Sequence, residues 1–386
     1  MNNFEPQVYD LLSRAGISGG RQLQAFIDNQ VMQKYNTLDI PGFAFAPTTQ
    51  LDFTYEQVQS ELNLNPVASY VDVDSPATPD ATKGANVIRG RIPRMKKAEY
   101  YNEDKIRKML ILEQRFGANS DNVRAAALAD LFISLDNLVG GHINSLSFQR
   151  HQIVSTGKFT LTADNNPNGV KGVTFASHVP NANTTTLSGT KRWWTDSEKT
   201  LEGTASDPIK DMVAMVEEAR RKGVRGHFEV NYNFLTKILG HSKVVATIGI
   251  NALPAAAAEV QTSYAAILGR GNKKAALEAL VGAAIVEQDH MVTVQKVVKG
   301  EIQNNMVDSF ASDVVVFVPD GSLGEIVTVE PIAISGGTYA NFLDGRGLVT
   351  IDADYRRKIQ AYNSELTSLV VPTLAHYFFY LKPTAA

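Results

Sequence analysis

Residues that could do chemistry are scattered along the chain. Gly16-Ile17-Ser18-Gly19-Gly20 fits G-x-S-x-G, a pattern that in hydrolases holds a nucleophilic serine on a strand-to-helix turn. A short helix is expected before it, which favours a simple glycine turn that ends this helix. The seven histidines form no compact metal-binding spacing, and we expect structural roles for them, Asp289-His290 included. We therefore expect no catalytic residue, no metal and no cofactor.

A glycine-rich segment and a pair of tryptophans give equally weak signals of a ligand-binding site. Gly269-Arg270-Gly271-Asn272-Lys273-Lys274 is basic, but it lacks the G-x-x-x-x-G-K-[ST] spacing of a phosphate-binding loop. A linker between two helices explains it better. Trp193-Trp194 could stack on a ligand, although burial as an anchor is the commoner role of such a pair.

The composition excludes several classes of protein. The 386 residues contain no Cys, which removes disulfides, thiolate zinc sites, iron–sulfur clusters and Cys nucleophiles. The net charge of -3 gives no overall basic field for nucleic acid. No apolar run reaches the roughly 18 residues of a membrane span, and the first residues do not resemble a signal peptide. We expect a soluble protein made in the cytoplasm.

One run of basic residues has a recognisable shape. We expect Lys105, Arg107 and Lys108 to lie on a solvated helix face. The earlier members precede this helix on a strand that we predict to protrude: Arg89, Arg91, Arg94, Lys96 and Lys97. Salt bridges to a neighbouring subunit are the favoured interpretation. Contact with nucleic-acid phosphates comes second, because no aromatic residues are interleaved for base stacking.

The first hundred residues predict extended structure that needs a neighbour. Residues 1–65 are polar and weakly periodic, with short helices expected at Glu5–Arg14 and Gln22–Gln33, and indicate an arm that packs on something else. Residues 66–100 predict two strands, around Val71–Val73 and Val87–Ile88, with Asp74–Asp80 as the tip between them. An isolated hairpin is marginal in water, so this excursion must also find a partner.

The rest of the chain predicts an α+β fold. A 3-4 apolar stripe predicts a helix from Asp121 to about Arg150, which Gly140-Gly141 should weaken or bend. A second helix should begin at Pro208, after an Asp207 N-cap, and end before Gly223. Further expected helices are Phe234–Leu239, Pro254–Val260 and Lys274–Leu280. Expected strands are Lys158–Thr162, Val170–Val179, Phe228–Val230, Val244–Ile250, Ala283–Glu287, Met291–Val298, Asp313–Val318, Glu325–Glu330 and Leu366–Leu381.

Four blocks in this order resemble the major capsid proteins of tailed bacteriophages. The similarity is closest to the lambda capsid-protein-E family, which has the Hong Kong 97 (HK97-like) capsid fold. The blocks are Ser155–Leu161 after the long helix, Trp194–Asp196 followed by Asp207–Ile209, Gly223–Arg225 through Phe234-Leu235 to His241–Val244, and Val316–Gly321. They span about 120–325.

The resemblance implies a domain layout and a function. The layout is an N-terminal arm (1–65), an extended loop or E-loop (66–112), a spine helix with a peripheral domain (113–208), an axial domain (209–345) and a return to the peripheral domain (346–386). Such subunits form hexamers and pentamers that close an icosahedral virion shell around packaged double-stranded DNA. The implied partners are portal, scaffolding and decoration proteins, with only weak, non-specific DNA contact and no membrane.

Two other functions stay open from the sequence. An encapsulin-like compartment would use the same fold to enclose an enzyme cargo. A cytosolic hydrolase would use Ser18 as its nucleophile. A capsid protein would have no enzymatic activity.

Overall fold

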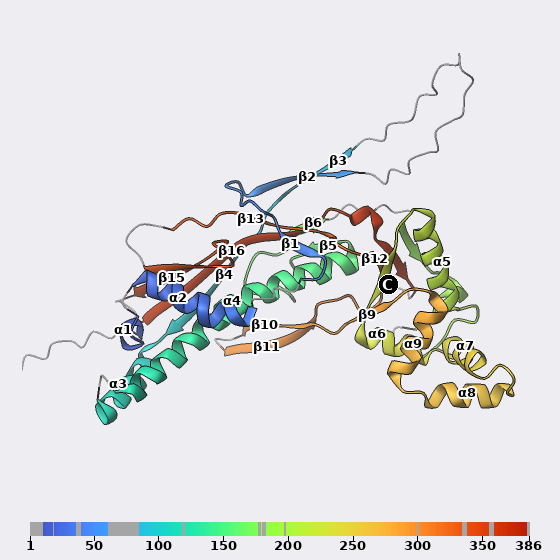
Figure 1. The fold of residues 1–386 in the computed structure, drawn as a ribbon, viewed down its shortest axis with the longest axis horizontal. Helices are drawn as coiled ribbons and strands as arrows, with labels where there is room; N and C mark the ends of the chain where they lie inside the picture. Colours follow the sequence, from blue (N-terminus) through green and yellow to red (C-terminus); the bar gives the residue numbers. More distant parts are fainter. Residues whose placement is uncertain are drawn as a thin grey trace, which may run out of the picture.

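The computed structural model describes most of the chain. The described residues are 11–17, 19–35, 40–60, 85–117, 120–176, 179, 183–196, 198–298, 301–333, 338–354 and 359–383. Ser18, His178 and the expected hairpin tip Asp74–Asp80 lie outside them, as does the expected strand around Val71–Val73. Helices and strands mix along the sequence, as the α+β prediction requires (Figure 1).

The larger sheet has β16 at its centre. β16 pairs antiparallel with β13, β15 and β4, and the path through the sheet runs β1-β13-β16-β15-β14. The strands are β1 (Phe43–Phe45), β4 (Arg94–Tyr101), β13 (Gly324–Thr328), β14 (Thr338–Phe342), β15 (Gly347–Asp354) and β16 (Ile359–Pro372). This sheet brings residues from both ends of the chain into one layer.

The long helix α4 (Asp121–Thr156) packs against this sheet (Figure 1). Ser120 caps its first turn by accepting a hydrogen bond from the Val123 amide, and Gly157 ends it in the left-handed conformation. At 1.5 Å per residue the helix is about 54 Å long. It extends beyond the Arg150 end that we predicted.

Gly140 and Gly141, which we expected to weaken or bend α4, lie within the continuous helix. A Cβ at Gly140 would collide with the Tyr35 hydroxyl, and one at Gly141 would lie 2.8 Å from the Lys97 side chain. The two glycines therefore serve close packing on the helix surface. Tertiary contacts offset their low helix propensity.

The N-terminal segment packs on the core of its own chain. It contains α1 (Leu11–Arg14) and α2 (Gly20–Phe26), followed by a π-helical turn (Ile27–Val31) and a 3-10 turn (Met32–Tyr35). Leu11, Leu23 and Ile27 are fully buried, in contact with the core around α4 and β14. These residues of the predicted arm therefore contribute to the core of their own chain.

The projecting ribbon confirms the strand predicted around Val87–Ile88, which is β3 (Ala85–Arg91), but its other strand is not the predicted one. β2 (Thr54–Ser60) pairs antiparallel with β3, so the ribbon's first strand comes from the segment that we assigned to the arm. Figure 1 shows this ribbon standing away from the main sheet. The chain then enters β4 inside that sheet and continues into α3 (Glu103–Phe116), which contacts α4. The basic positions Lys105, Arg107 and Lys108 of α3 are exposed, as predicted.

A second body contains the remaining helices and a five-stranded sheet of order β7-β17-β12-β8-β9 (Figure 1). The helices are α5 (Pro208–Arg221), α6 (Tyr232–Gly240), α7 (Ser242–Ala252), α8 (Ala258–Ile267) and α9 (Arg270–Val281). The strands are β7 (Thr184–Thr186), β8 (Gly226–Asn231), β9 (Ile285–Gln288), β12 (Val315–Pro319) and β17 (Phe379–Lys382). The predicted helix after Asp207 is confirmed, with the Asp207 side chain accepting from the Lys210 amide at 3.1 Å.

Two predictions in this region were wrong. Val244–Ile250 lies in helix α7, because Val244 and Ile248 are buried one turn apart and the His241 side chain caps the first turn. The expected strand Leu366–Leu381 is two strands in different sheets: β16 ends at Pro372, and a 3-10 turn (Ala375–Tyr377) precedes β17.

The five-stranded sheet lies between two hydrophobic cores. On β12, Val316 and Val318 belong to the core around α4, whereas Val315 and Phe317 belong to the core beneath α5 and α6. Strand side chains alternate between faces, so one all-apolar strand can serve both cores. Burial of Val315–Pro319 on both faces matches the expectation of a buried strand. The two bodies are thereby joined through a shared layer.

Two small antiparallel ribbons complete the fold. β5 (Lys158–Thr160) pairs with β6 (Thr174–Ala176) after α4, and β10 (Met291–Val298) pairs with β11 (Glu301–Asp308). Figure 1 shows the β10–β11 ribbon running back from the second body alongside α4. None of the helices in the described ranges combines the length and apolarity needed to cross a lipid bilayer.

Candidate functional site

The basic residues predicted to contact a neighbouring subunit divide into two groups. Arg89 and Arg91 lie on β3 of the projecting ribbon, and both are exposed. Arg89 lies opposite Glu56 on β2 and pairs with its carboxylate at 2.9 Å. The guanidinium is 75% exposed and the carboxylate 55%, so this ion pair is solvated and weak.

Arg94, Lys96 and Lys97 lie on β4, within the main sheet and not on the protruding strand that we predicted. Arg94 donates to Glu365 of β16, and Lys96 lies 3.8 Å from the same carboxylate.

Lys97 projects toward α4, where its ammonium donates to the Asn137 carbonyl at 2.7 Å, and burial lowers its pKa. The sequence placed this group on the ribbon because β4 follows β3 after only two residues. The pairing of β4 with β16 joins residues far apart in the chain: Arg94 and Glu365 are separated by 271 residues. The sequence around β4 therefore gives no signal of this pairing.

A Ser–His–Glu grouping exists, but its geometry does not support catalysis. His241 Nε2 lies 3.2 Å from Ser206 Oγ and 3.7 Å from a Glu202 oxygen. His241 Nδ1 accepts from the Lys243 amide, so a neutral ring carries its proton on Nε2. Nε2 therefore cannot take the serine proton, as a general base must. The Ser206 hydroxyl instead donates to the Gly203 carbonyl at 2.6 Å.

The remaining sequence candidates have structural surroundings. Within the described ranges, no three His, Asp or Glu side chains are arranged to hold a metal ion. Trp193 is fully buried, donates to Asp211 at 2.8 Å and stacks on Phe234, as expected of an anchor. Gly16 has a φ of 77° after α1, and Gly19 precedes α2, which begins at Gly20, so the described residues of the G-x-S-x-G pattern follow a helix and not a strand. Gly269–Lys274 forms the start of α9 and not a separate linker.

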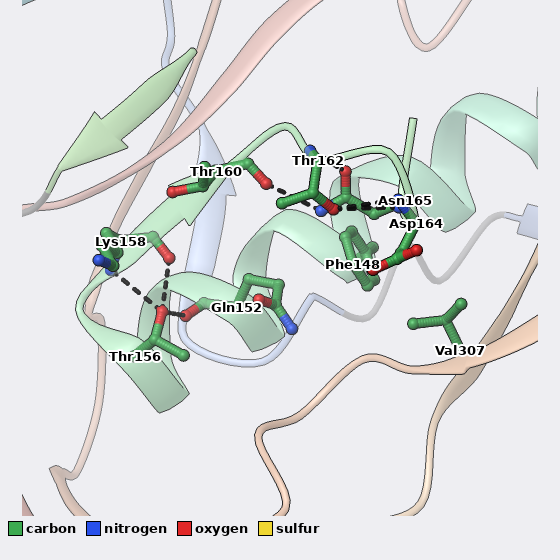
Figure 2. Close-up of a pocket in the computed structure, with 9 residues that line it drawn as sticks. All are labelled: Phe148, Gln152, Thr156, Lys158, Thr160, Thr162, Asp164, Asn165 and Val307. Carbon is green, nitrogen blue, oxygen red and sulfur yellow. Dashed lines mark hydrogen bonds between the residues drawn. The ribbon is translucent and has the colours of Figure 1, made fainter. Parts of the chain in front are cut away.

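One shallow pocket lies at the end of α4 (Figure 2). Its volume is about 240 Å³, and it is lined by Phe148, Gln152, Thr156, Lys158, Thr160, Thr162, Asp164, Asn165 and Val307. Figure 2 shows several of its polar groups bonded to each other. The Thr156 hydroxyl donates to the Gln152 carbonyl at 2.7 Å, and the Asn165 amide donates to the Thr160 carbonyl at 2.8 Å. These bonds hold the 160–165 turn in place.

A buried ion pair between the two bodies has no counterpart in the sequence predictions. Arg150 of α4 and Glu229 of β8 each have 1% of the side chain exposed. The guanidinium forms two hydrogen bonds to the carboxylate, one of them at 2.7 Å, and its Nε donates to the Pro41 carbonyl at 3.3 Å. Such paired geometry offsets much of the cost of burying two charges. The available sequence signal was a single acid between Phe228 and Val230.

Polar neighbours complete this junction, which we define as Arg150, His151, Glu229 and Gln288. The Gln288 amide donates to Glu229 at 2.9 Å and its oxygen lies 3.0 Å from His151 Nε2. Burial opposes ionisation of Glu229, but interaction with His227 and the charge of Arg150 outweigh it and lower its pKa to about 2. The carboxylate is therefore ionised at neutral pH and holds α4 against the five-stranded sheet.

Comparisons with known proteins identify the family. A family described as Phage major capsid protein E matches residues 21–342. Among solved structures, a capsid protein of a prophage from E. coli CFT073 is 12% identical (95% of this chain, 99% of that chain, TM-score 0.49). A phage-related protein from Bordetella bronchiseptica RB50 is 14% identical (98% of each chain, TM-score 0.44), and the mature capsid of bacteriophage PhiM1 is 11% identical (88% and 85%, TM-score 0.44).

A search among curated proteins finds no match. The family match covers most of the sequence, including α4, the ribbon β2–β3 and the Arg150–Glu229 junction. The resemblance found in the sequence blocks is thereby confirmed. The chain belongs to the phage major capsid protein E family.

Proposed function

We propose that this chain assembles as hexamers and pentamers into the icosahedral shell of a tailed bacteriophage and that the shell encloses the double-stranded DNA genome. The observation that carries the proposal is the match to the phage major capsid protein E family over residues 21–342. Self-assembly follows from membership of that family. The capsomer types and the shell geometry are the parts that need an experiment.

The junction between the two bodies supports a structural role for this chain in the shell. A shell must withstand the pressure of packed, like-charged DNA, and this chain has no Cys for disulfides. A shared five-stranded sheet and the buried Arg150–Glu229 pair join the bodies instead. Removing one member of such a pair leaves an uncompensated buried charge, so the arrangement strongly favours one relative position.

The projecting ribbon is the best candidate for salt bridges between subunits. Arg91 is exposed on β3, and Arg89 has only a solvated partner, so either guanidinium can exchange to an acidic group on a neighbour. Arg94, Lys96 and Lys97 are less free, because each already contacts a group in its own chain.

The proposal also includes the partner proteins of the shell and the domain layout of the chain. We expect portal, scaffolding and decoration proteins as partners, assembly in the host bacterial cytoplasm, and no enzymatic activity. The domain bounds given above for the arm, E-loop, peripheral and axial domains remain part of it. The net charge of -3 supports weak, non-specific contact with packaged DNA, because a strongly basic chain would hold it tightly.

The alternatives make different predictions about contents and activity. An encapsulin-like shell would contain an enzyme cargo and need no portal. A hydrolase using Ser18 would lose its activity on Ser18→Ala. The family match favours the phage capsid over both.

The direct test is expression of the chain alone and then with the neighbouring virion genes. Size-exclusion chromatography and electron microscopy should show rings, tubes or closed shells. Nuclease-protected DNA in particles made with the packaging proteins would support the phage role. A stable monomer or dimer that never assembles with those proteins would overturn it.

A further inference from the structure

The sequence contains one Asn that is followed directly by Gly, in the pair Asn168-Gly169. The pair lies between β5 and β6, in a segment that we call the 162–172 loop, and both residues are exposed. In such a pair the backbone nitrogen of the glycine can attack the side-chain amide of the asparagine, because glycine has no Cβ to hinder the approach. The exposed loop also gives water free access to this amide.

Two other asparagines of the loop lack this chemistry. Asn166 precedes Pro167, whose backbone nitrogen carries no hydrogen and therefore cannot act as the nucleophile. Asn165 precedes a residue with a Cβ, and its side chain accepts from the Thr162 amide and donates to the Thr160 carbonyl, both at 2.8 Å (Figure 2). We therefore expect these two asparagines to stay unmodified.

The side chain of Asn168 contacts a different part of the fold. Its Nδ2 donates to the Gln295 carbonyl of β10 at 2.8 Å, which joins the loop to the ribbon β10–β11. The assignment of the nitrogen is clear, because only the amide NH₂ group can donate to a carbonyl. The backbone nitrogen of Gly169 is held by a long bond of 3.3 Å to the Asn166 carbonyl. The attacking nitrogen is thus weakly engaged, and the group that it would attack ties the loop to β10.

We propose that Asn168-Gly169 is a site of spontaneous deamidation and that this modification releases the 162–172 loop from β10. The Gly169 nitrogen bonds to the side-chain carbonyl carbon of Asn168 and gives up its proton, and the side-chain nitrogen leaves as ammonia. Water then opens the five-membered imide at either of its carbonyl groups, which yields aspartate or isoaspartate at position 168. The reaction transfers no electrons and needs water as its only other reactant.

The product cannot keep the contact with β10. An ionised carboxylate has no hydrogen to donate, and its negative charge repels the Gln295 carbonyl oxygen. Isoaspartate also adds a methylene group to the backbone, which displaces the loop further. Because no enzyme is required, the modified fraction grows with the age of the protein. This inference is a property of the folded chain and does not depend on the proposed function.

The contact with β10 should also slow the reaction. Ring closure requires the Asn168 side chain to turn toward its own backbone, which the bond to Gln295 opposes. We therefore expect slower deamidation in the folded chain than in the unfolded chain. The rate should rise with pH in both, because the attacking nitrogen reacts after losing its proton.

Mass spectrometry tests the site. The folded protein and the urea-unfolded protein are kept at mildly alkaline pH and then digested with trypsin, which should release Phe159–Lys171 with all three asparagines of the loop. We expect the mass change of an amide-to-acid exchange at Asn168, at a lower rate in the folded protein, and no change at Asn165 or Asn166. Asn168→Gln is the control and should stay unmodified, because its imide would need a larger ring. No modification of Asn168 in the folded protein, or equal modification at Asn165 or Asn166, would overturn the proposal.

Limited digestion of the folded protein tests the release of the loop. Lys171 lies exposed in the loop, so trypsin cleavage after it reports how often the loop opens. Asn168→Asp, which imitates one product, should be cleaved there about threefold to tenfold faster than the unmodified chain, as the loss of one hydrogen bond predicts. Asn168→Gln, which keeps an amide donor, should be cleaved at nearly the unmodified rate. Circular dichroism checks that both variants fold. Equal cleavage of all three proteins would overturn the inference that this contact holds the loop.

Discussion

The side-chain amide of Gln24 forms both backbone hydrogen bonds of Asn341. Its nitrogen donates to the Asn341 carbonyl at 2.8 Å, and its oxygen accepts from the Asn341 amide at 2.7 Å. Asn341 lies on β14, at the edge of the main sheet. One side chain of α2 thus takes the place of a missing strand, which covers part of an edge that could otherwise pair with another chain.

Replacing Gln24 should loosen the N-terminal segment. Gln24→Ala removes two half-buried hydrogen bonds, and we expect a loss of about 1–3 kcal/mol in the free energy of unfolding. Urea titration measures this loss, and hydrogen exchange at Asn341 should rise with it. Arg21→Ala, at an exposed position of the same helix, is the control and should change little. Equal stability of the two variants would contradict the role of Gln24.

Breaking the buried junction should be more costly. Glu229→Gln leaves Arg150 as a buried, uncompensated charge, and we expect a loss of about 3–5 kcal/mol in unfolding free energy. Arg150→Met should have an effect of similar size. Because both changes remove the same interaction, the double variant should lose much less than the sum, as a double-mutant cycle in urea would measure. Simple additivity would show that the two side chains act independently.

Gly140→Ala should destabilise α4, although this substitution usually stabilises a helix by up to about 1 kcal/mol. The new methyl group would displace the Tyr35 hydroxyl, which donates to Asp136 at 2.7 Å, and we expect a loss of about 1–3 kcal/mol. Tyr35→Phe in the same chain should restore part of the loss, because the colliding oxygen is gone. Gly271→Ala in α9 is the control, since a Cβ there meets nothing within 4 Å. Thermal unfolding of the four proteins tests this; no rescue by Tyr35→Phe would contradict the collision.

Stability should fall on mild acidification. Burial, with nearby cationic charge, lowers the pKa of His142 and of His151 from 6.5 to about 4. Between these values the unfolded chain binds more protons, so stability rises with pH through this window and is lost as pH falls through it. Each histidine can contribute up to about 3 kcal/mol between pH 7 and pH 4.

Unfolding free energies between pH 4 and 8 check this slope. His142→Gln, which can keep a hydrogen bond to Ser364, should flatten it. The effect of Glu229 has the same sign but a lower pH range. Its pKa is lowered from 4.5 to about 2, so its contribution to stability is lost progressively as the pH falls from about 4.5 to about 2. An unchanged slope in His142→Gln would assign the acid sensitivity to other groups.

The sequence by itself determined features that depend on neighbours in the chain. The α4 helix begins at Asp121 as predicted, Asp207 caps α5, and the all-apolar strand Val315–Pro319 is buried on both faces. Caps and apolar periodicity act over a few residues, so a single sequence carries them in full. The order of motifs along the chain also carried the family resemblance.

Only the tertiary structure decided how distant segments meet. Arg94–Lys97 joined the main sheet because β16 offers a partner, and Val244–Ile250 became helical because two of its residues are buried one turn apart. Arg150 and Glu229 are 79 residues apart, and nothing local marks them as partners. Pairing across such separations is fixed by packing of the whole chain, since burial of a charge is tolerable only where the fold supplies its counter-charge.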